Sequence, residues 1–205
     1  MKRVLLLIII LVLAAGPAHA QGGWIAPYGD PSGTDCAVWD AAPALLPVYI
    51  FHHSTPGATA SRFAVELSGG AEWSLVYLAD NPGFPWVQGD VWNGITVCYN
   101  ECLAGPILVT TINFFGQGFS PTCSRIEVVP HPAAESGRVE VVDCADNIVT
   151  ATGGPAIVNQ DLGCICAINA SAPQESIVLS SRTFQFCETI PIENSSWGKI
   201  KALFE

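Results

Sequence analysis

The sequence is poor in basic residues, and this shortage limits the partners that it can bind. Eight Lys and Arg stand against 18 Asp and Glu in the 205 residues. Removal of an N-terminal leader of 20 residues, predicted below, leaves six basic residues and a formal charge of −12. An acidic surface of this kind repels phosphate backbones and anionic lipid headgroups. The composition therefore argues against nucleic-acid and membrane-surface partners.

Long apolar runs are also missing, apart from one at the N-terminus. Val4–Leu13 is uninterrupted and apolar, follows the positive charges of Lys2 and Arg3, and precedes the small-residue pattern Ala18-His19-Ala20. These are the three parts of a secretory signal peptide, with cleavage after Ala20. The run is too short for a spanning helix, which needs about 20 apolar residues. We expect a secreted or cell-surface protein with no membrane span in the mature chain.

Helical periodicity is absent between residues 21 and 188, where short apolar runs alternate with Gly, Pro, Asn and Ser turns. Ile95–Tyr99 and Ile107–Phe115 have the composition of strands buried on both faces. Arg62–Leu67, Arg125–Val128 and Arg138–Val141 alternate, which predicts one dry face and one wet face that carries Arg and Glu. Many short strands with frequent turns predict an all-β, antiparallel two-sheet sandwich, immunoglobulin-like, over residues 21–188. Further strands are expected at Trp24–Tyr28, Leu45–His53, Trp73–Leu78, Ile148–Ala151, Cys164–Ile168 and Phe184–Cys187.

All eight cysteines lie in the predicted mature chain. In an exported protein an even number favours disulfides, and eight allow 105 pairings that spacing cannot separate. Two short spacings, Cys98-x3-Cys102 and Cys164-x-Cys166, are also compatible with a thiolate metal site. Because export favours oxidation, we predict no metal and up to four disulfides among Cys36, Cys98, Cys102, Cys123, Cys144, Cys164, Cys166 and Cys187.

Motifs for nucleophilic and metal-assisted hydrolysis are missing. The sequence has no Gly-x-Ser-x-Gly and no His-Glu-x-x-His. His52 and His53 are adjacent in an expected strand and so point to opposite faces, while His131 lies between two prolines. We predict that the protein is not an enzyme, and a hydrolase with an unrecognised site is the second alternative.

Aromatic residues are concentrated in one stretch, where Trp73, Phe84, Trp86 and Trp92 fall within twenty residues among amides and carboxylates. Exposed Trp rings beside such groups would suit sugars, whereas large aromatic residues more often belong to a core. The stretch makes a carbohydrate-binding module, with an extracellular glycan as ligand, the first alternative. Its binding residues would be Trp86, Trp92, Asp90 and Asn93.

Three loops combine Asp with Asn, Ser or Gly, as calcium sites do: Asp30–Asp35, Asp80–Asn81 and Asp90–Asn93. None has the complete EF-hand pattern, and the same residues are ordinary in turns. We predict no cofactor, with calcium as the alternative.

The C-terminal segment, residues 189–205, differs from the domain. After a linker, Ser195-Ser196 provides a helix N-cap, and Trp197, Ile200, Leu203 and Phe204 recur at helical spacing beside Lys199 and Lys201. So short a helix is marginal alone and needs a surface to dock against.

This ending, Trp-Gly-x-Ile-Lys-x-Leu-Phe, resembles the C-terminus of a group of uncharacterised exported bacterial β-sandwich proteins. Thr55–Ala60 and Ala151–Gly154 also resemble that group. The resemblance implies export and surface sorting, and it implies no activity. Together these observations predict a secreted or cell-surface, non-enzymatic protein of structural or adhesive type that contacts a glycan or a cell-surface component. Its C-terminal segment would serve in sorting or docking.

Overall fold

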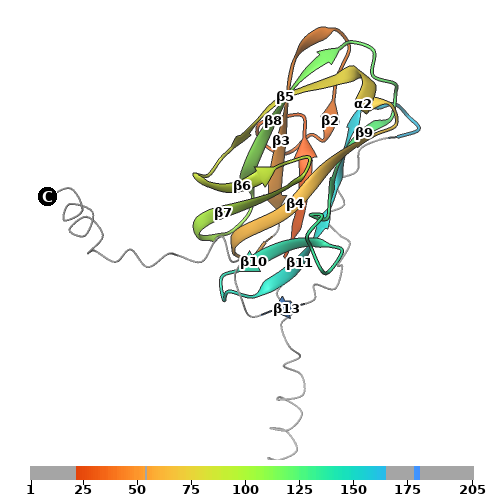
Figure 1. Ribbon diagram of the computed structural model, residues 1–205. Helices are drawn as coiled ribbons and strands as arrows, with labels where there is room; N and C mark the ends of the chain where they lie inside the picture. Colours follow the sequence, from red (N-terminus) through yellow and green to blue (C-terminus); the bar gives the residue numbers. More distant parts are fainter. Residues whose placement is uncertain (1–21, 54, 165–177, 181–205) are drawn as a thin grey trace, which may run out of the picture.

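In a computed structural model, residues 22–53, 55–164 and 178–180 are described, and these residues form an almost entirely β structure (Figure 1). The predicted all-β two-sheet sandwich is confirmed. Its strands are β1 (Trp24–Tyr28), β2 (Ala37–Val38), β3 (Pro43–His53), β4 (Ala58–Ser68), β5 (Leu75–Pro82), β6 (Trp86–Asp90), β7 (Gly94–Leu103), β8 (Ile107–Gln117), β9 (Ser124–Val129), β10 (Val139–Asp143), β11 (Ile148–Gly153), β12 (Pro155–Val158) and β13 (Val178–Ser180).

The strands form two layers. One layer has the order β1-β3-β8-β5, and the other begins with β6-β7-β4. The N-terminal half of β4 pairs with β10 and its C-terminal half pairs with β9, so β4 is the central strand of the second layer. A short parallel pairing of β1 with β11 joins the layers along one side. β10, β11 and β13 lie at one end of the sandwich, and α2 and β2 lie at the other (Figure 1).

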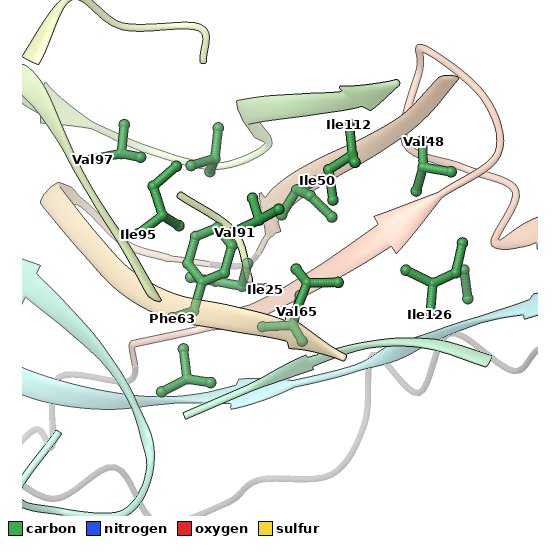
Figure 2. Packing of buried hydrophobic residues seen from close by; sticks show 14 of the residues in the cluster. Ile25, Val48, Ile50, Phe63, Val65, Val91, Ile95, Val97, Ile112 and Ile126 are labelled. Atoms are coloured by element: carbon green, nitrogen blue, oxygen red, sulfur yellow. The ribbon is translucent and has the colours of Figure 1, made fainter. Parts of the chain in front are cut away.

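The core fills the space between the layers. Figure 2 shows Ile25 and Ile50 of the first layer facing Phe63, Val65 and Ile95 of the second. The described residues of this cluster come from nearly every strand, so apolar burial of the inner face holds most of the strands in place.

The two central apolar runs lie in opposite layers. In β7, residues 94–99 are all buried, as predicted for a strand covered on both faces. For β8 the same prediction is wrong, because Leu108 and Phe115 point outward and are exposed. β8 pairs with β3 and β5, and no described element covers its outer face.

The predicted wet face of β10 is also wrong, since all five of its residues are buried. Glu140 lies directly across from Arg62 of β4, which forms an ion pair with it and donates from Nε to Oε2 at 2.9 Å. Ser136 donates a further hydrogen bond to the other carboxylate oxygen at 2.9 Å. The charge can be buried because both of its oxygens have donors.

One short helix interrupts an expected strand. Trp73 belongs to α2 (Ala71–Ser74), and the strand predicted for Trp73–Leu78 begins only at Leu75. Pro43 and Pro47 lie in the first half of β3. This half of β3 pairs with β8 alone, because β1 reaches only as far as Tyr49.

Disulfides cross-link the described part of the chain. Cys102 bonds to Cys144, Cys123 bonds to Cys164, and Cys36 and Cys98 are disulfide-bonded as well. No cysteine in the described ranges is free. Several predicted features lie outside the described residues: Cys166, Cys187, the strand Phe184–Cys187, the leader and the C-terminal segment. Of the predicted strand Cys164–Ile168, only Cys164 is described, and it lies in a bend. None of the helices among the described residues has the length and apolar character needed to cross a membrane.

Candidate functional site

Three large aromatic side chains near one end of the sandwich are more than half exposed. Trp39 is 56%, Trp73 75% and Phe119 60% exposed, although rings of this size are usually well buried. Each one directly precedes a buried polar residue in the sequence, and one of these polar residues, Ser120, contacts the other two. We call Trp39, Trp73 and Phe119 the aromatic end.

The buried polar residues are Asp40, Ser74 and Ser120, and they form a hydrogen-bonded cluster. The carboxylate of Asp40 accepts bonds from the backbone N–H of Gly118 at 2.7 Å, from the N–H of Ser120 at 3.1 Å and from Ser120 Oγ at 2.5 Å. Ser120 Oγ also contacts Ser74 Oγ, which links α2 to the loop after β8. Three segments that are distant in sequence are therefore joined beneath the exposed rings.

Asn159, which follows β12, completes this cluster. Its amide donates to the carbonyl of Ser120 at 2.7 Å and to the carbonyl of Asp40 at 3.2 Å, and its Oδ1 accepts the N–H of Asp40 at 2.9 Å. Satisfied buried polar networks fix the backbone that carries them. The aromatic end is thus presented on an ordered framework, which lowers the entropy lost when a partner orders the rings.

Local sequence explains how the chain reaches this arrangement. Gly118 has φ 82°, a backbone conformation that side chains disfavour, and it lets the chain turn so that two N–H groups flank Phe119 and meet one carboxylate. At Gly116, a Cβ would collide with the Asp40 carboxylate, so only glycine leaves space for the cluster beneath β8.

An apolar row on the outer face of the first layer begins next to the aromatic end. Leu45 of β3 and Val76 of β5 both lie opposite Phe115 of β8, and the three side chains are between 42% and 62% exposed. Neither β3 nor β8 contains an Asp, Glu, Lys or Arg. An exposed apolar surface across three neighbouring strands is a feature of interaction sites.

Charged residues near the aromatic end are mostly acidic. Glu72 is exposed beside Trp73, and Asp161 is exposed two residues after Asn159. Among the described residues, the basic residue nearest in sequence to any of the three rings is Arg125 of β9, which follows Phe119. The described residues include no lysine and only three arginines, at positions 62, 125 and 138. A partner with basic residues around an apolar centre would therefore complement this surface.

The four predicted glycan-binding residues lie at the two ends of β6: Trp86 begins the strand, and Asp90, Trp92 and Asn93 lie at its end and in the turn that follows. Trp86 is 55% exposed at the start of β6. Trp92 is only partly exposed, because its ring packs edge-on against Phe114 of the core and against Tyr77. Asp90 and Asn93 bond to each other within the turn between β6 and β7, at 2.9 and 3.1 Å. The glycan site stays a prediction, with Trp86 as its exposed ring.

Two of the three calcium candidates, Asp30–Asp35 and Asp90–Asn93, are hydrogen-bonded turns, and the third, Asp80–Asn81, lies within β5. Asp30 accepts bonds from Ser32, Thr34 and Asp35; burial opposes its ionisation, but these bonds outweigh that effect and lower the pKa of Asp30 to about 2. Asp80 accepts the Tyr77 hydroxyl at 2.6 Å and the Val91 N–H at 3.0 Å. These carboxylates thus already accept hydrogen bonds from nearby groups of the chain, and calcium binding stays a prediction.

The candidate metal spacings contain disulfide-bonded cysteines instead of thiolates. Cys123, Asp161 and Cys164 lie within ligand distance of one another, but the two sulfurs are bonded together. Cys98 and Cys102 are each disulfide-bonded too, and Cys102 bonds to Cys144. Neither spacing therefore offers a pair of thiolates among the described residues.

His52 and His53, the adjacent histidines at the end of β3, contact different sets of neighbours. His52 is fully buried, with Nε2 2.6 Å from the Gly22 carbonyl and Nδ1 3.2 Å from the Tyr99 hydroxyl. Burial lowers the pKa of His52 to about 4. His53 packs between the rings of Trp24 and Phe51.

Comparisons with known proteins give distant likenesses of fold. No known family and no curated protein matches the sequence. Among solved structures, a cohesin module of a family 33 glycoside hydrolase from Clostridium perfringens is similar at TM-score 0.47 and 7% identity, covering 69% of this chain and 99% of that one. The sixth cohesin of scaffoldin B from Acetivibrio cellulolyticus, solved with a Cel5 dockerin, has TM-score 0.41, 16% identity and coverage of 69% and 100%. A type I ScaB cohesin from Pseudobacteroides cellulosolvens has TM-score 0.32, 8% identity and coverage of 71% and 96%. Likenesses this distant assign no function.

Sequence reasoning missed the aromatic end. Trp73 was expected in a strand, and Trp39 and Phe119 drew no prediction. A usable signal was present: Phe119 lies in Gly-Phe-Ser-Pro, a turn sequence in which a large ring has no regular element to bury it.

Proposed function

We propose that this chain is a secreted or cell-surface, non-enzymatic binding domain of adhesive type that engages a polypeptide through the aromatic end. The observation that carries the proposal is the exposure of Trp39, Trp73 and Phe119 on a backbone fixed by a buried polar cluster. Rigid exposed aromatic side chains are the residues that most often dominate binding energy at protein interfaces.

The chemistry of the surface defines the partner. The apolar row Leu45–Phe115–Val76 adds flat contact area next to the rings, and the nearby acids Glu72 and Asp161 favour basic residues at the edge. The expected partner is a polypeptide segment with apolar side chains beside Lys or Arg. Export and a sorting function for the C-terminal segment are part of the proposal, supported by the sequence of the leader and of residues 197–204.

A peptide-display selection tests this proposal. The mature chain, its Trp197→Asp variant and a Trp39→Ala/Trp73→Ala/Phe119→Ala variant are each immobilised and exposed to a random 12-residue library. The C-terminal segment is itself apolar and basic, so it could occupy the surface in place of a library peptide. Trp197→Asp places a charge in its apolar side and removes this competition. We expect apolar, basic peptides to be enriched on one or both of the first two proteins and lost on the triple variant.

Trp86→Ala is the matched control, because Trp86 is as exposed as Trp39 but lies on β6. Enrichment that survives the triple variant, or no enrichment on any protein, would contradict the proposal. A glycan array with and without calcium runs in parallel. Glycan binding that Trp86→Ala abolishes would support the carbohydrate-binding alternative instead.

A further inference from the structure

We propose that the C-terminal segment Trp197–Phe204 docks on the aromatic end of its own molecule. The inference rests on the proposed function, since it names an occupant for the same surface. A domain that carries its partner sequence on its own chain would be covered until a competing polypeptide displaced the segment.

The chemistry of the two surfaces is complementary. The segment combines Trp197, Ile200, Leu203 and Phe204 at helical spacing with Lys199 and Lys201. No other lysine is present after residue 20, so the segment holds every lysine of the predicted mature chain. The aromatic end has exposed rings, and next to it lie the uncharged apolar row and the carboxylates of Glu72 and Asp161. In a docked arrangement the apolar side chains of the segment would contact the exposed rings, and its lysines would pair with the carboxylates.

The length of the chain permits the contact. β13 ends at Ser180 beside Ile148, at the end of the sandwich opposite α2 (Figure 1). The distance to be crossed is about the length of the eleven-residue strand β4, which rises roughly 36 Å. The 17 residue steps from Ser180 to Trp197 extend to about 55 Å.

Attachment to the same chain favours binding of the C-terminal segment over binding of a separate peptide from solution. Being joined to the domain by a linker of this length would give the segment an effective concentration of roughly millimolar. A helix of about two turns is marginal in water and gains stability by burying its apolar side on a partner surface. The fixed backbone of the aromatic end adds little ordering cost of its own.

The distribution of lysines makes a direct test possible. A carbodiimide joins a lysine amine to a neighbouring carboxylate with no spacer, so in the mature chain every lysine cross-link begins at Lys199 or Lys201. Peptide mapping separates these from links made by the N-terminal amine. We expect the mature wild-type protein to give links to Glu72 or Asp161. Links only to Glu101 or Asp146, which lie toward the opposite end, or no lysine links at all, would overturn the proposal.

Isotope mixing distinguishes docking within one molecule from docking between copies. Equal amounts of ¹⁴N- and ¹⁵N-labelled protein are mixed before cross-linking. Pairs that carry a single isotope support docking in cis, and pairs that carry both isotopes in statistical proportion would overturn it in favour of a second copy.

Variants locate the docking surface. Trp39→Ala/Trp73→Ala/Phe119→Ala should lower the yield of links to Glu72 and Asp161 about tenfold, and Trp86→Ala should leave it unchanged. Trp197→Asp changes no described residue and should lower the yield as much, which keeps the test valid if the triple variant folds poorly. Equal yields from Trp197→Asp and wild type would overturn docking. Library peptides that bind Trp197→Asp at the aromatic end would still uphold the proposed function, so the two proposals can fail separately.

Discussion

Replacing Asp40 by Asn should loosen the aromatic end while leaving the fold in place. The side chain is 2% exposed, and its two oxygens accept the N–H groups of Gly118 and Ser120 together with the Ser120 hydroxyl. An amide of the same shape keeps one acceptor and presents N–H₂ where the other oxygen was. At least one buried donor then faces another donor, so the free energy of unfolding should fall by about 2 kcal/mol.

Two measurements on the oxidised protein check this expectation. Urea unfolding followed by tryptophan fluorescence should show a lower midpoint with an unchanged slope. Amide hydrogen exchange should accelerate at Gly118 and Ser120, the two residues that flank Phe119, more than in the core strand β7.

Asp146→Asn is the matched control. It makes the same chemical change in an exposed turn and should stay within about 0.5 kcal/mol of wild type. An Asp40→Asn protein as stable as this control, with unchanged exchange at Gly118 and Ser120, would refute the role given to the buried cluster.

Three further changes test the framework around the site. Because burial lowers the pKa of His52 to about 4, the unfolded chain takes up the proton first as the pH falls below about 6.5. His52 should therefore contribute a loss of about 2 kcal/mol in the free energy of unfolding from pH 7 to pH 5, and His52→Gln should reduce the total drop by that amount in urea unfolding at the two pH values. Arg62→Ala leaves Glu140 buried without its ion pair and should cost about 3 kcal/mol by the same assay, whereas Arg62→Met/Glu140→Met should recover much of this loss. Gly57→Ala places a Cβ against the sulfurs of the Cys102–Cys144 disulfide and should lower the thermal midpoint, at a cost of about 1–3 kcal/mol.

Each of these changes has a contradicting result. A pH dependence that is equal in wild type and His52→Gln would remove His52 as its cause. A double Met variant less stable than Arg62→Ala would show that the loss does not come from an unpaired, buried Glu140. An unchanged midpoint for Gly57→Ala would show that the disulfide can move aside.

The fold could be predicted from the sequence because its signals are local. Alternation in β4 and β9, the buried run in β7 and the frequent Gly and Pro turns each depend on neighbouring residues alone. The assignment of β7 and β8 to opposite layers depends instead on strand pairing over long distances, which the local pattern does not contain.

The errors have the same origin. Glu140 appeared solvent-facing from alternation, and it is buried because Arg62 lies across from it in another strand. The aromatic end escaped prediction because Asp40, Ser74, Ser120 and Asn159 are separated by at least 34 positions in the sequence and meet only in the folded domain. What the sequence offered was a concentration of aromatic residues around Trp86, and one of its rings, Trp92, packs against the core.

The most direct measurement of the central claim is the affinity of one selected apolar, basic peptide for three proteins by fluorescence anisotropy. These proteins are Trp197→Asp and the same chain with either Trp73→Ala or Trp86→Ala added. The account predicts that Trp73→Ala weakens binding by about 2 kcal/mol, roughly thirtyfold in Kd, while Trp86→Ala leaves Kd within a factor of two. Equal affinity for Trp73→Ala and its parent, or a loss confined to Trp86→Ala, would contradict it.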